Sequence, residues 1–197
     1  MILEGIVTTL NPGGEPNIAP MGPRVESTMR RFVLKPYRTS TTYRNLKARG
    51  EGVLHVTDDV LLLARAAIGD PGDVATRPAE VVEGRILVDT CRYYEFRVVE
   101  WDDRDERTTL VAETLAEGRV RDFFGFNRAK HAVIEAAILA TRTSFLPLEE
   151  ILGDYRRLAP LVEKTGGPRE REAFALLGRH LNEVARGRGL DPETPGR

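Results

Sequence analysis

Cysteine is nearly absent from this chain of 197 residues, which contains Cys91 and no second thiol. A disulfide within the chain and a zinc site built from several cysteines are therefore excluded. Such sparing use of cysteine is typical of proteins in a reducing compartment.

An excess of charge is also missing, since 29 lysines and arginines face 30 aspartates and glutamates and the net charge is −1. A small module that is basic throughout and binds nucleic acid is excluded, as is an acidic disordered chain. The 41% of hydrophobic residues and 30% of charged residues are typical of a globular protein with a substantial core.

Long apolar stretches are lacking as well, because no segment approaches the ~18 uncharged apolar residues that a membrane-spanning helix needs. The first residues, Met1 to Gly5, show neither the basic region nor the apolar region of a secretory signal. We therefore expect a soluble, cytoplasmic protein that has no membrane partner.

Although the total charge is small, its distribution along the chain is uneven. The segment 24–49 has eight basic residues and one acid, a local charge of +7, and the basic residues are Arg24, Arg30, Arg31, Lys35, Arg38, Arg44, Lys47 and Arg49. The segment 95–106 has six acids, Glu95 among them, against two arginines, and we interpret these acids as a solvated hairpin tip. A concentrated basic segment in a neutral chain indicates an anion site or a nucleic-acid face, with a solvated surface as the alternative.

Strand patterns precede helix patterns along the chain, which predicts an α+β protein. The expected strands are 2–10, 17–25, 31–35, 51–57, 84–90, 92–101 and 108–120. A barrel suits them better than a parallel sheet, because only one long helical crossover, residues 60–68, interrupts them, and residues 69–80 are expected to form a loop. Pro20 and Pro23 place the second strand at a sheet edge, since proline cannot donate to a ladder.

Three further helices are predicted in the last third of the chain, beginning near Asn127, Pro147 and Pro168. The first of them carries a stripe of small residues that allows close helix packing. The expected organisation is a barrel domain over residues 2–122, a helical extension packed on it over 123–187, and a disordered tail over 188–197.

The segment 35–46, Lys-Pro-Tyr-Arg-Thr-Ser-Thr-Thr-Tyr-Arg-Asn-Leu, is the strongest candidate for a functional site. It places Arg38 and four consecutive hydroxyl residues at the start of a predicted short helix that ends at Gly50. A helix N-terminus offers unpaired backbone N–H groups and the positive end of the helix dipole, and Arg38 can hold two phosphate oxygens in a fork. The alternative is that Thr39 or Ser40 merely caps the helix.

Several stretches of the sequence follow one another in an order that resembles the FMN-binding split-barrel superfamily of flavin reductases and pyridoxamine-phosphate oxidases. They are Glu4–Thr9 with the Asn-Pro-Gly-Gly turn, Asn17–Gly22, Arg31–Leu34, the motif Ser40-Thr41-Thr42-x-x-Asn45-Leu46, and Val53–Thr57. Within the superfamily the chain is similar to an archaeal and bacterial family without an assigned reaction, whose helical signature residues 126–142 resemble. The resemblance covers residues 2–185 and depends on the order of loose motifs.

This resemblance implies a split β-barrel with a C-terminal helical extension, and a homodimer that holds FMN in a groove at the subunit interface. The strand that would lie along the isoalloxazine ring contains Asn17, Ala19, Pro20 and Met21. The phosphate would be held, with support from Asn45, by Arg38, Thr39, Ser40, Thr41 and Thr42. The chain lacks the glycine-rich fingerprint of a Rossmann dinucleotide site.

The function implied is that of an FMN-dependent oxidoreductase acting on a small molecule, with NAD(P)H as a candidate reductant. The flavin itself would supply the electron or hydride chemistry, which explains why the chain shows no obvious acid–base motif. The alternative is a flavin-binding or small-ligand-binding module without turnover. Binding of nucleic acid is disfavoured, because the last helices alternate charge sign rather than presenting a basic recognition face.

A second polar cluster, at the start of the first C-terminal helix, consists of Asn127, Arg128, Lys130 and His131. Basic side chains at a helix start oppose the helix dipole and therefore require an anionic partner. We interpret the cluster as a contribution to the flavin or substrate site, and the alternative is an ordinary basic turn on a solvated face. No set of His, Asp and Glu residues has the spacing of a metal site.

Overall fold

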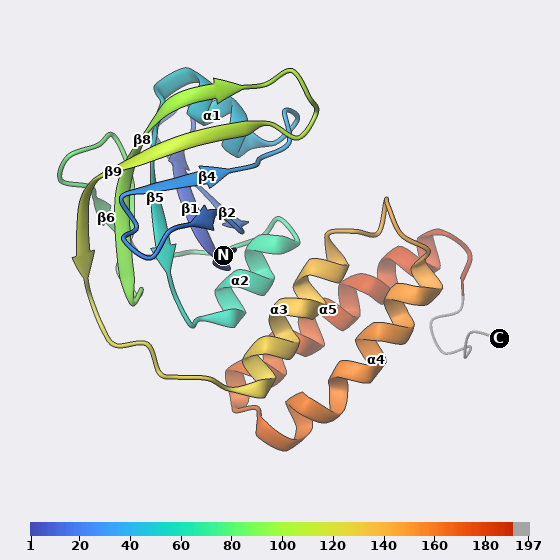
Figure 1. Cartoon of the computed structure of the whole chain (residues 1–197). Helices are drawn as coiled ribbons and strands as arrows, with labels where there is room; N and C mark the ends of the chain where they lie inside the picture. The colour runs from blue at the N-terminus through green and yellow to red at the C-terminus, as the bar shows by residue number, and fades with distance from the viewer. Residues whose placement is uncertain (191–197) are drawn as a thin grey trace. The chain divides into compact units, whose positions relative to one another are not determined.

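The computed structural model describes residues 1–190, and the chain divides into two compact units (Figure 1). The first unit comprises Met1–Asp58 and Asp73–Phe123, and contains every strand of the described chain together with one helix. The second unit comprises Asp59–Gly72 and, of the described residues, 124–190, and it contains helices and no strand in this described part. The predicted α+β class is confirmed. Of the predicted tail 188–197, residues 188 and 189 form a turn, and residues 191–197 lie outside the described residues.

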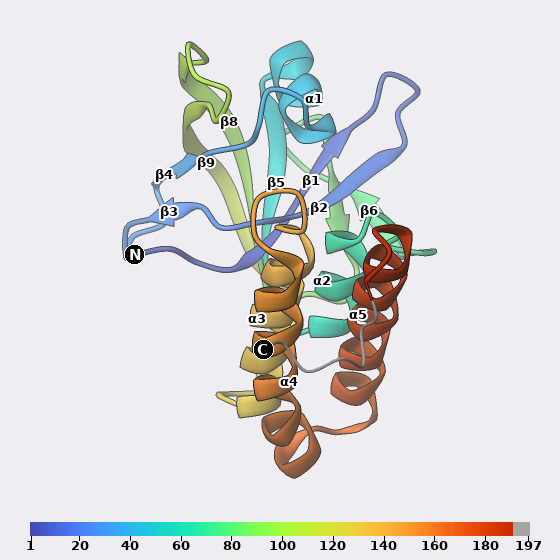
Figure 2. The ribbon, with the colours of Figure 1, turned by 90° about the vertical axis from the view of Figure 1, so that its right-hand side faces the viewer.

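A seven-stranded antiparallel sheet forms the first unit, in the order β2-β1-β5-β8-β9-β4-β3. Its strands are β1 (Gly5–Leu10), β2 (Pro16–Met21), β3 (Arg24–Val25), β4 (Arg31–Leu34), β5 (Glu51–Val56), β8 (Arg92–Asp102) and β9 (Thr109–Arg119). Figures 1 and 2 show that this sheet is strongly curled. A small second sheet pairs β6 (Thr76–Pro78) with β7 (Arg85–Leu87).

The strand expected over residues 17–25 is two strands, which lie at opposite edges of the sheet. Only Gly22 and Pro23 separate β2, which pairs with β1, from β3, which pairs with β4. A two-residue connection can join the two edges of a seven-stranded sheet only when the sheet curls until its edges meet, so this connection requires a barrel-like closure. The prolines correctly predict that β2 is an edge strand, but the break at Pro23 was missed.

Two other sequence-based expectations for this unit are wrong. The segment 69–80, expected as a loop, contains β6, because Thr76–Pro78 finds a partner in β7. Glu95, expected at a solvated hairpin tip, is fully buried, and its carboxylate accepts hydrogen bonds from three successive backbone N–H groups, those of residues 80, 81 and 82. Such bonds compensate the cost of burying the charge.

The core of the first unit lies inside the curl of the sheet. Phe32 and Phe96 meet edge to face with their ring centroids 5.2 Å apart. Gly52 is needed beside them, because a Cβ atom there would stand 2.9 Å from the ring of Phe96. His55, fully buried, joins three strands, since its Nδ1 lies 3.3 Å from the carbonyl of Ile6 and its Nε2 accepts from the N–H of Leu87 at 3.1 Å.

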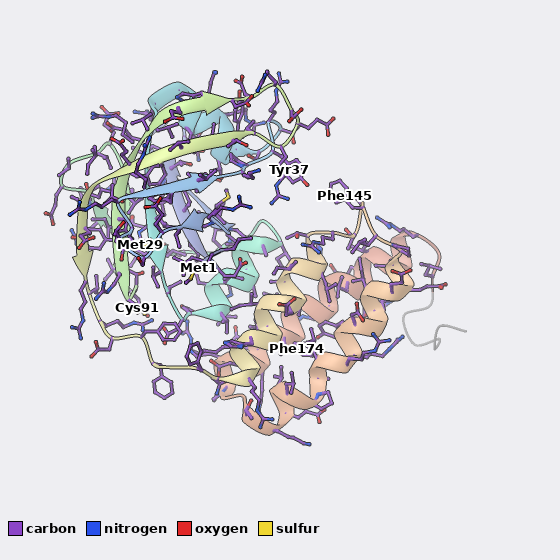
Figure 3. The ribbon with its side chains drawn as sticks, in the orientation of Figure 1. Met1, Met29, Tyr37, Cys91, Phe145 and Phe174 are labelled. Carbon is purple, nitrogen blue, oxygen red and sulfur yellow. The ribbon has the colours of Figure 1, made fainter. Side chains whose placement is uncertain are left out.

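Cys91, labelled in Figure 3, is buried in the first unit just before β8. Its Sγ lies 3.2 Å from Nη1 of Arg121, but burial dominates and raises the pKa of the thiol. A protonated, buried thiol is a poor nucleophile, so Cys91 behaves as a small core residue.

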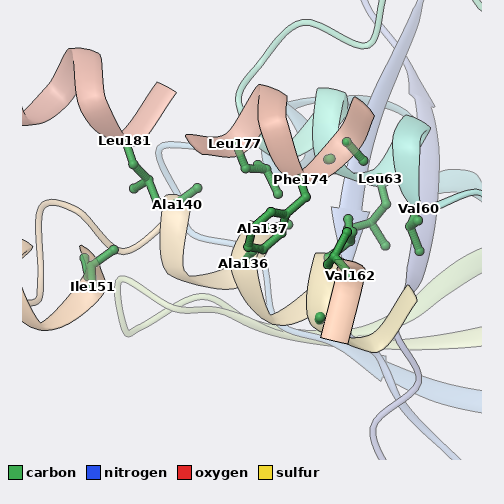
Figure 4. Packing of buried hydrophobic residues seen from close by; sticks show 14 of the residues in the cluster. Val60, Leu63, Ala136, Ala137, Ala140, Ile151, Val162, Phe174, Leu177 and Leu181 are labelled. Atoms are coloured by element: carbon green, nitrogen blue, oxygen red, sulfur yellow. The ribbon is translucent and has the colours of Figure 1, made fainter. Parts of the chain in front are cut away.

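The helical unit consists of α2 (Val60–Ala67), α3 (Arg128–Ala140), α4 (Leu148–Thr165) and α5 (Pro168–Gly187). Asp59 caps α2 by accepting from the N–H groups of Leu61 and Leu62, each at 3.1 Å. The predicted small-residue stripe of α3 is buried, and Figure 4 shows Ala137 close to Phe174 and Leu177 of α5. None of the helices of residues 1–190 is long and apolar enough to cross a membrane.

Candidate functional site

The first helix of the chain, α1 (Thr41–Arg49), is the only helix of the strand-rich unit within the described residues. Ser40 caps it: its Oγ accepts from the N–H of Tyr43 at 3.1 Å and donates to the carbonyl of Tyr37 at 2.7 Å. Gly50 ends the helix with a left-handed φ of 72°, a conformation that favours glycine. Both ends of α1 are therefore fixed by local interactions that the sequence predicted.

The start of α1 presents backbone donors that the protein does not use. The N–H groups of Thr39, Thr41 and Thr42 have no hydrogen-bond acceptor within residues 1–190. Such N–H groups, together with the positive end of the helix dipole, form a site for an anion. Ser40 differs from its neighbours, because its hydroxyl is already engaged as donor and acceptor.

Two guanidinium groups stand at the same helix start without carboxylate partners. The side chain of Arg38 is exposed and forms no ion pair within residues 1–190. Arg44 donates to the carbonyl of Thr39 at 2.9 Å and to Oγ1 of Thr41 at 3.0 Å, and likewise has no carboxylate partner in the described chain. Arg44 was not predicted as a site residue. Its position three residues after Thr41, on the same face of the helix, was the available signal.

Three of the six other basic residues of the segment 24–49 are neutralised by carboxylates. Arg31 pairs with Glu100 at 2.8 Å, Lys47 pairs with Asp103 at 2.8 Å, and Arg49 pairs with Glu83 at 2.5 Å. Arg24, Arg30 and Lys35 form no ion pair within residues 1–190 either, so Arg38 and Arg44 are distinguished by their position beside the start of α1.

A buried amide network ties the start of α1 to the sheet. Nδ2 of Asn17 donates to Oγ1 of Thr9 at 3.2 Å and to Oγ1 of Thr42 at 3.1 Å. Nδ2 of Asn45 donates to the same Thr9 oxygen at 3.1 Å and to Oδ1 of Asn11 at 3.0 Å. The structure thus brings together Asn17, Thr42 and Asn45 from the predicted site, with Thr9 as the shared acceptor that the prediction missed.

This network divides the predicted residues by what they can offer a ligand. Thr42 and Asn45 are almost fully buried, so their side chains support the helix rather than face outward. Asn17 is half-buried, and its side-chain carbonyl oxygen has no donor within residues 1–190, which leaves it open to a hydroxyl or N–H group of a ligand.

The remaining predicted residues of the strand, Ala19, Pro20 and Met21, lie half-exposed on β2. They pair with β1 on one side, and β2 is the last strand of the sheet on the other. An edge strand leaves part of its backbone donors and acceptors outside the ladder. These groups are compatible with a flat polar ligand along β2, and the assignment of the ring to this strand remains a prediction.

A groove with a volume of about 1140 Å³ runs alongside α1 within the first unit. Thr41 and Arg44 line it at the start of the helix, and Glu80 and Glu83 line it from the segment that Glu95 holds in place. Its volume suits a small-molecule site. The sequence did not predict it, because its two walls are more than thirty residues apart along the chain.

The second predicted cluster lies in the helical unit and is engaged there. Asn127 caps α3, with Oδ1 accepting from the N–H groups of Ala129 and Lys130, and its Nδ2 donates to the carbonyl of Thr165 at 3.0 Å. Nζ of Lys130 lies 3.7 Å from Oε1 of Glu170. Glu170 is thus an anionic partner of the kind that the helix dipole required.

Arg128 and His131, the other members of the cluster, are exposed, and the ring of His131 stands edge-on to Phe126 with centroids 6.0 Å apart. The structure therefore gives Asn127 and Lys130 roles within the helical unit, while the contribution of the cluster to a flavin site remains a prediction.

Comparisons with protein families and solved structures identify the family and the fold of this chain. The model described as "Protein of unknown function (DUF447) N-terminal domain" matches residues 3–121, and the model "Protein of unknown function (DUF447)" matches residues 127–179. The structure of the FMN-bound protein MM1853 from Methanosarcina mazei, of the same family, is similar with a TM-score of 0.75 and 26% identity. The match covers 91% of this chain and 94% of that one.

More distant structures share the strand-rich part. Flavoredoxin of Desulfovibrio vulgaris matches with a TM-score of 0.53 and 16% identity over 60% of this chain and 69% of its own. An FMN-binding protein from Thermus thermophilus with bound 1-cyclohex-2-enone matches with a TM-score of 0.52 and 13% identity over 60% and 70%. At such identities the likeness shows the fold, and the predicted split barrel is confirmed. The chain belongs to the DUF447 family.

Proposed function

We propose that this protein binds FMN with the phosphate at the start of α1, and that it is an FMN-dependent oxidoreductase acting on a small molecule. One observation carries the proposal: unused backbone donors at residues 39, 41 and 42 stand beside the unpaired guanidinium groups of Arg38 and Arg44. The FMN named in the Methanosarcina mazei structure, at 26% identity over 91% of this chain, supports this ligand and agrees with the predicted cofactor.

The groups at the start of α1 fit the phosphate of FMN. A phosphate monoester carries nearly two negative charges at neutral pH and has three strong acceptor oxygens. The N–H groups of Thr41 and Thr42 would donate along the helix axis, while Arg38 would add a charge-assisted fork. Arg44, already held against Thr39 and Thr41, would add its charge without further ordering.

The rest of the flavin would lie near Asn17 and the edge of β2. The half-buried Asn17 is fixed by Thr9 and Thr42, so its free carbonyl oxygen is pre-positioned as an acceptor. Bound FMN supplies the electron or hydride transfer, and the chain supplies binding and orientation.

The proposal includes a homodimer in which the flavin lies at the subunit interface. Its support is the resemblance to the split-barrel superfamily, together with the open edge of β2. Sedimentation equilibrium of the protein with and without FMN tests it. A monomer at the concentrations at which FMN binds would contradict the interface site while leaving FMN binding intact.

A binding module without turnover is the second candidate. It is favoured by the chemistry of the α1 site, whose groups are hydrogen-bond donors and cations that bind phosphate rather than exchange protons at neutral pH. Steady-state oxidation of NADH or NADPH by the FMN-loaded protein, with an added small-molecule acceptor, distinguishes the two.

The central test is titration of the purified protein with FMN, followed by its visible absorbance and fluorescence. We expect saturable binding at micromolar FMN. If no binding occurs at that concentration, the proposed cofactor and the proposed oxidoreductase activity are both wrong.

A further inference from the structure

The tip of the β8–β9 hairpin reaches back to α1 and contacts it through one carboxylate. Oδ2 of Asp103 accepts from Oη of Tyr43 and from Nζ of Lys47, each at 2.8 Å. Tyr43 and Lys47 are four residues apart and so lie on one face of the helix. A single oxygen of the hairpin therefore contacts side chains from the first and last turns of α1.

The same hairpin also holds the segment that leads into α1. The carbonyl of Glu106 accepts from the N–H of Arg38 at 2.9 Å. Two residues on, the backbone N–H and the hydroxyl of Thr108 both donate to the carbonyl of Pro36, at 3.0 and 2.8 Å. Arg107 lies over the ring of Tyr37, with 5.6 Å between the guanidinium carbon and the ring centroid, and Figure 3 labels Tyr37 in the first unit.

The hairpin therefore contacts the chain both before and after the first residue of α1. It fixes the backbone at residues 36 and 38 before Ser40, and the side chains of Tyr43 and Lys47 after it. The unused N–H groups of residues 39, 41 and 42 lie between these two sets of contacts. The contacts to the helix itself come from Asp103 and from the ring of Trp101, over which Lys47 lies.

The electrostatics of the contact keep it intact at neutral pH. The ammonium of Lys47 and the hydroxyl of Tyr43 hold the pKa of Asp103 below its usual value, so the carboxylate is ionised. The hydrogen bond to Asp103 in turn raises the pKa of Tyr43, so the phenol keeps the proton that it donates. Lys47 also lies 5.1 Å over the ring of Trp101.

We infer that Asp103 is a positioning residue for the phosphate of FMN: through Tyr43 it sets the orientation of the N-terminal turn of α1 that binds the phosphate. This inference rests on the proposed function. A helix start held in the binding geometry before the ligand arrives avoids the cost of ordering it on binding.

A purely electrostatic role makes the opposite prediction. A carboxylate near the start of α1 repels a phosphate, so loss of its charge alone would strengthen FMN binding. The Tyr43→Phe variant separates the two effects, because it removes one hydrogen bond of the contact and leaves every charge in place.

The experiment compares the affinities of FMN and of riboflavin, which lacks the phosphate, for the full chain and its variants. We expect Tyr43→Phe to weaken FMN about tenfold, the scale of a hydrogen bond to a charged group, and to leave riboflavin unchanged. Asp102→Asn is the matched control, because Asp102 lies in the same hairpin but pairs with Arg104 at 2.7 Å instead of contacting α1.

Unchanged FMN affinity in Tyr43→Phe overturns the inference, and so does an equal loss for FMN and riboflavin. Where riboflavin binds too weakly to titrate, or where Tyr43→Phe does not fold, Asp103→Ala decides. It should weaken FMN although it removes a negative charge, with partial recovery in Asp103→Glu, and a gain in affinity overturns the inference. Failure of the unaltered protein to bind FMN contradicts the proposed function itself, which is a different result.

Discussion

The starts of α1 and α3 look alike in sequence, yet the structure uses them differently. Each begins with a polar cap, Ser40 or Asn127, followed by basic side chains. At α3 the cap accepts from two backbone N–H groups, and Lys130 pairs with Glu170. At α1 the cap accepts from one, and neither nearby guanidinium has a carboxylate partner in the described chain.

The difference shows that a helix start becomes a candidate anion site through what is left unsatisfied, not through its composition. Around α3, Glu170 arrives from a helix that begins about forty residues later and neutralises the lysine. Around α1, Asp103 of the β8–β9 hairpin pairs with Lys47, and Arg38 forms no ion pair within residues 1–190. Three substitution or pH experiments test this comparison.

The largest effect is expected from the two arginines at α1. Replacing both Arg38 and Arg44 with alanine should weaken FMN by about a hundredfold, because two charge-assisted contacts to the phosphate are lost. Replacing Arg24 and Arg30, two exposed arginines of the same basic segment that lie outside the predicted site, with alanine removes the same charge and is the matched control. Isothermal titration of FMN checks the prediction. Equal losses in the double variant and the control would mean that only overall charge matters.

A smaller effect, on stability, is expected at the cap of α3. Asn127→Ala removes an acceptor for two N–H groups and a donor to Thr165, and should lower the free energy of unfolding by about 1.5 kcal/mol. Urea denaturation followed by circular dichroism measures it. FMN affinity should stay unchanged, since the side chain is fully engaged within its own unit. A specific loss of FMN affinity would instead support the prediction that Asn127 belongs to the flavin site.

The α1 site was predictable where its signals are local. Ser40, the hydroxyl run and Gly50 fix the ends of α1 within a dozen residues, and the prolines place β2 at an edge. What the sequence could not show are partners that arrive from far along the chain. The buried carboxylate of Glu95 accepts hydrogen bonds from N–H groups of residues 80–82, and the hydroxyl of Thr9 accepts from two asparagines of other elements.

The same limit applies to the barrel. Alternating patterns identified most strands, but the break between β2 and β3 depends on which neighbours the two halves pair with. Likewise, Thr76–Pro78 forms a strand because it pairs with β7, although the glycines, aspartates and prolines around it favour a loop. Tertiary pairing, rather than local propensity, decides these strands.

The smallest expected effect is a difference between the two units in how their stability depends on pH. Burial lowers the pKa of His55, in the unit that carries α1, to about 3, whereas an unfolded chain binds a proton there near pH 6.5. The neutral ring contributes stability that is fully present above about pH 6.5 and is lost as the pH falls toward 3. Between pH 7 and 5.5 we expect the free energy of unfolding to fall by about 1 kcal/mol.

Hydrogen exchange at these two pH values, corrected for intrinsic rates, locates the loss. It should appear in β1, β5 and β7, the strands that His55 joins, before it appears in α3 or α5. His55→Gln should be less stable at pH 7 but should lose this part of the pH dependence, because glutamine does not titrate. If exchange accelerates first in α3 or α5, groups other than His55 cause the acid sensitivity. The unit that carries α1 is then not the more acid-sensitive of the two.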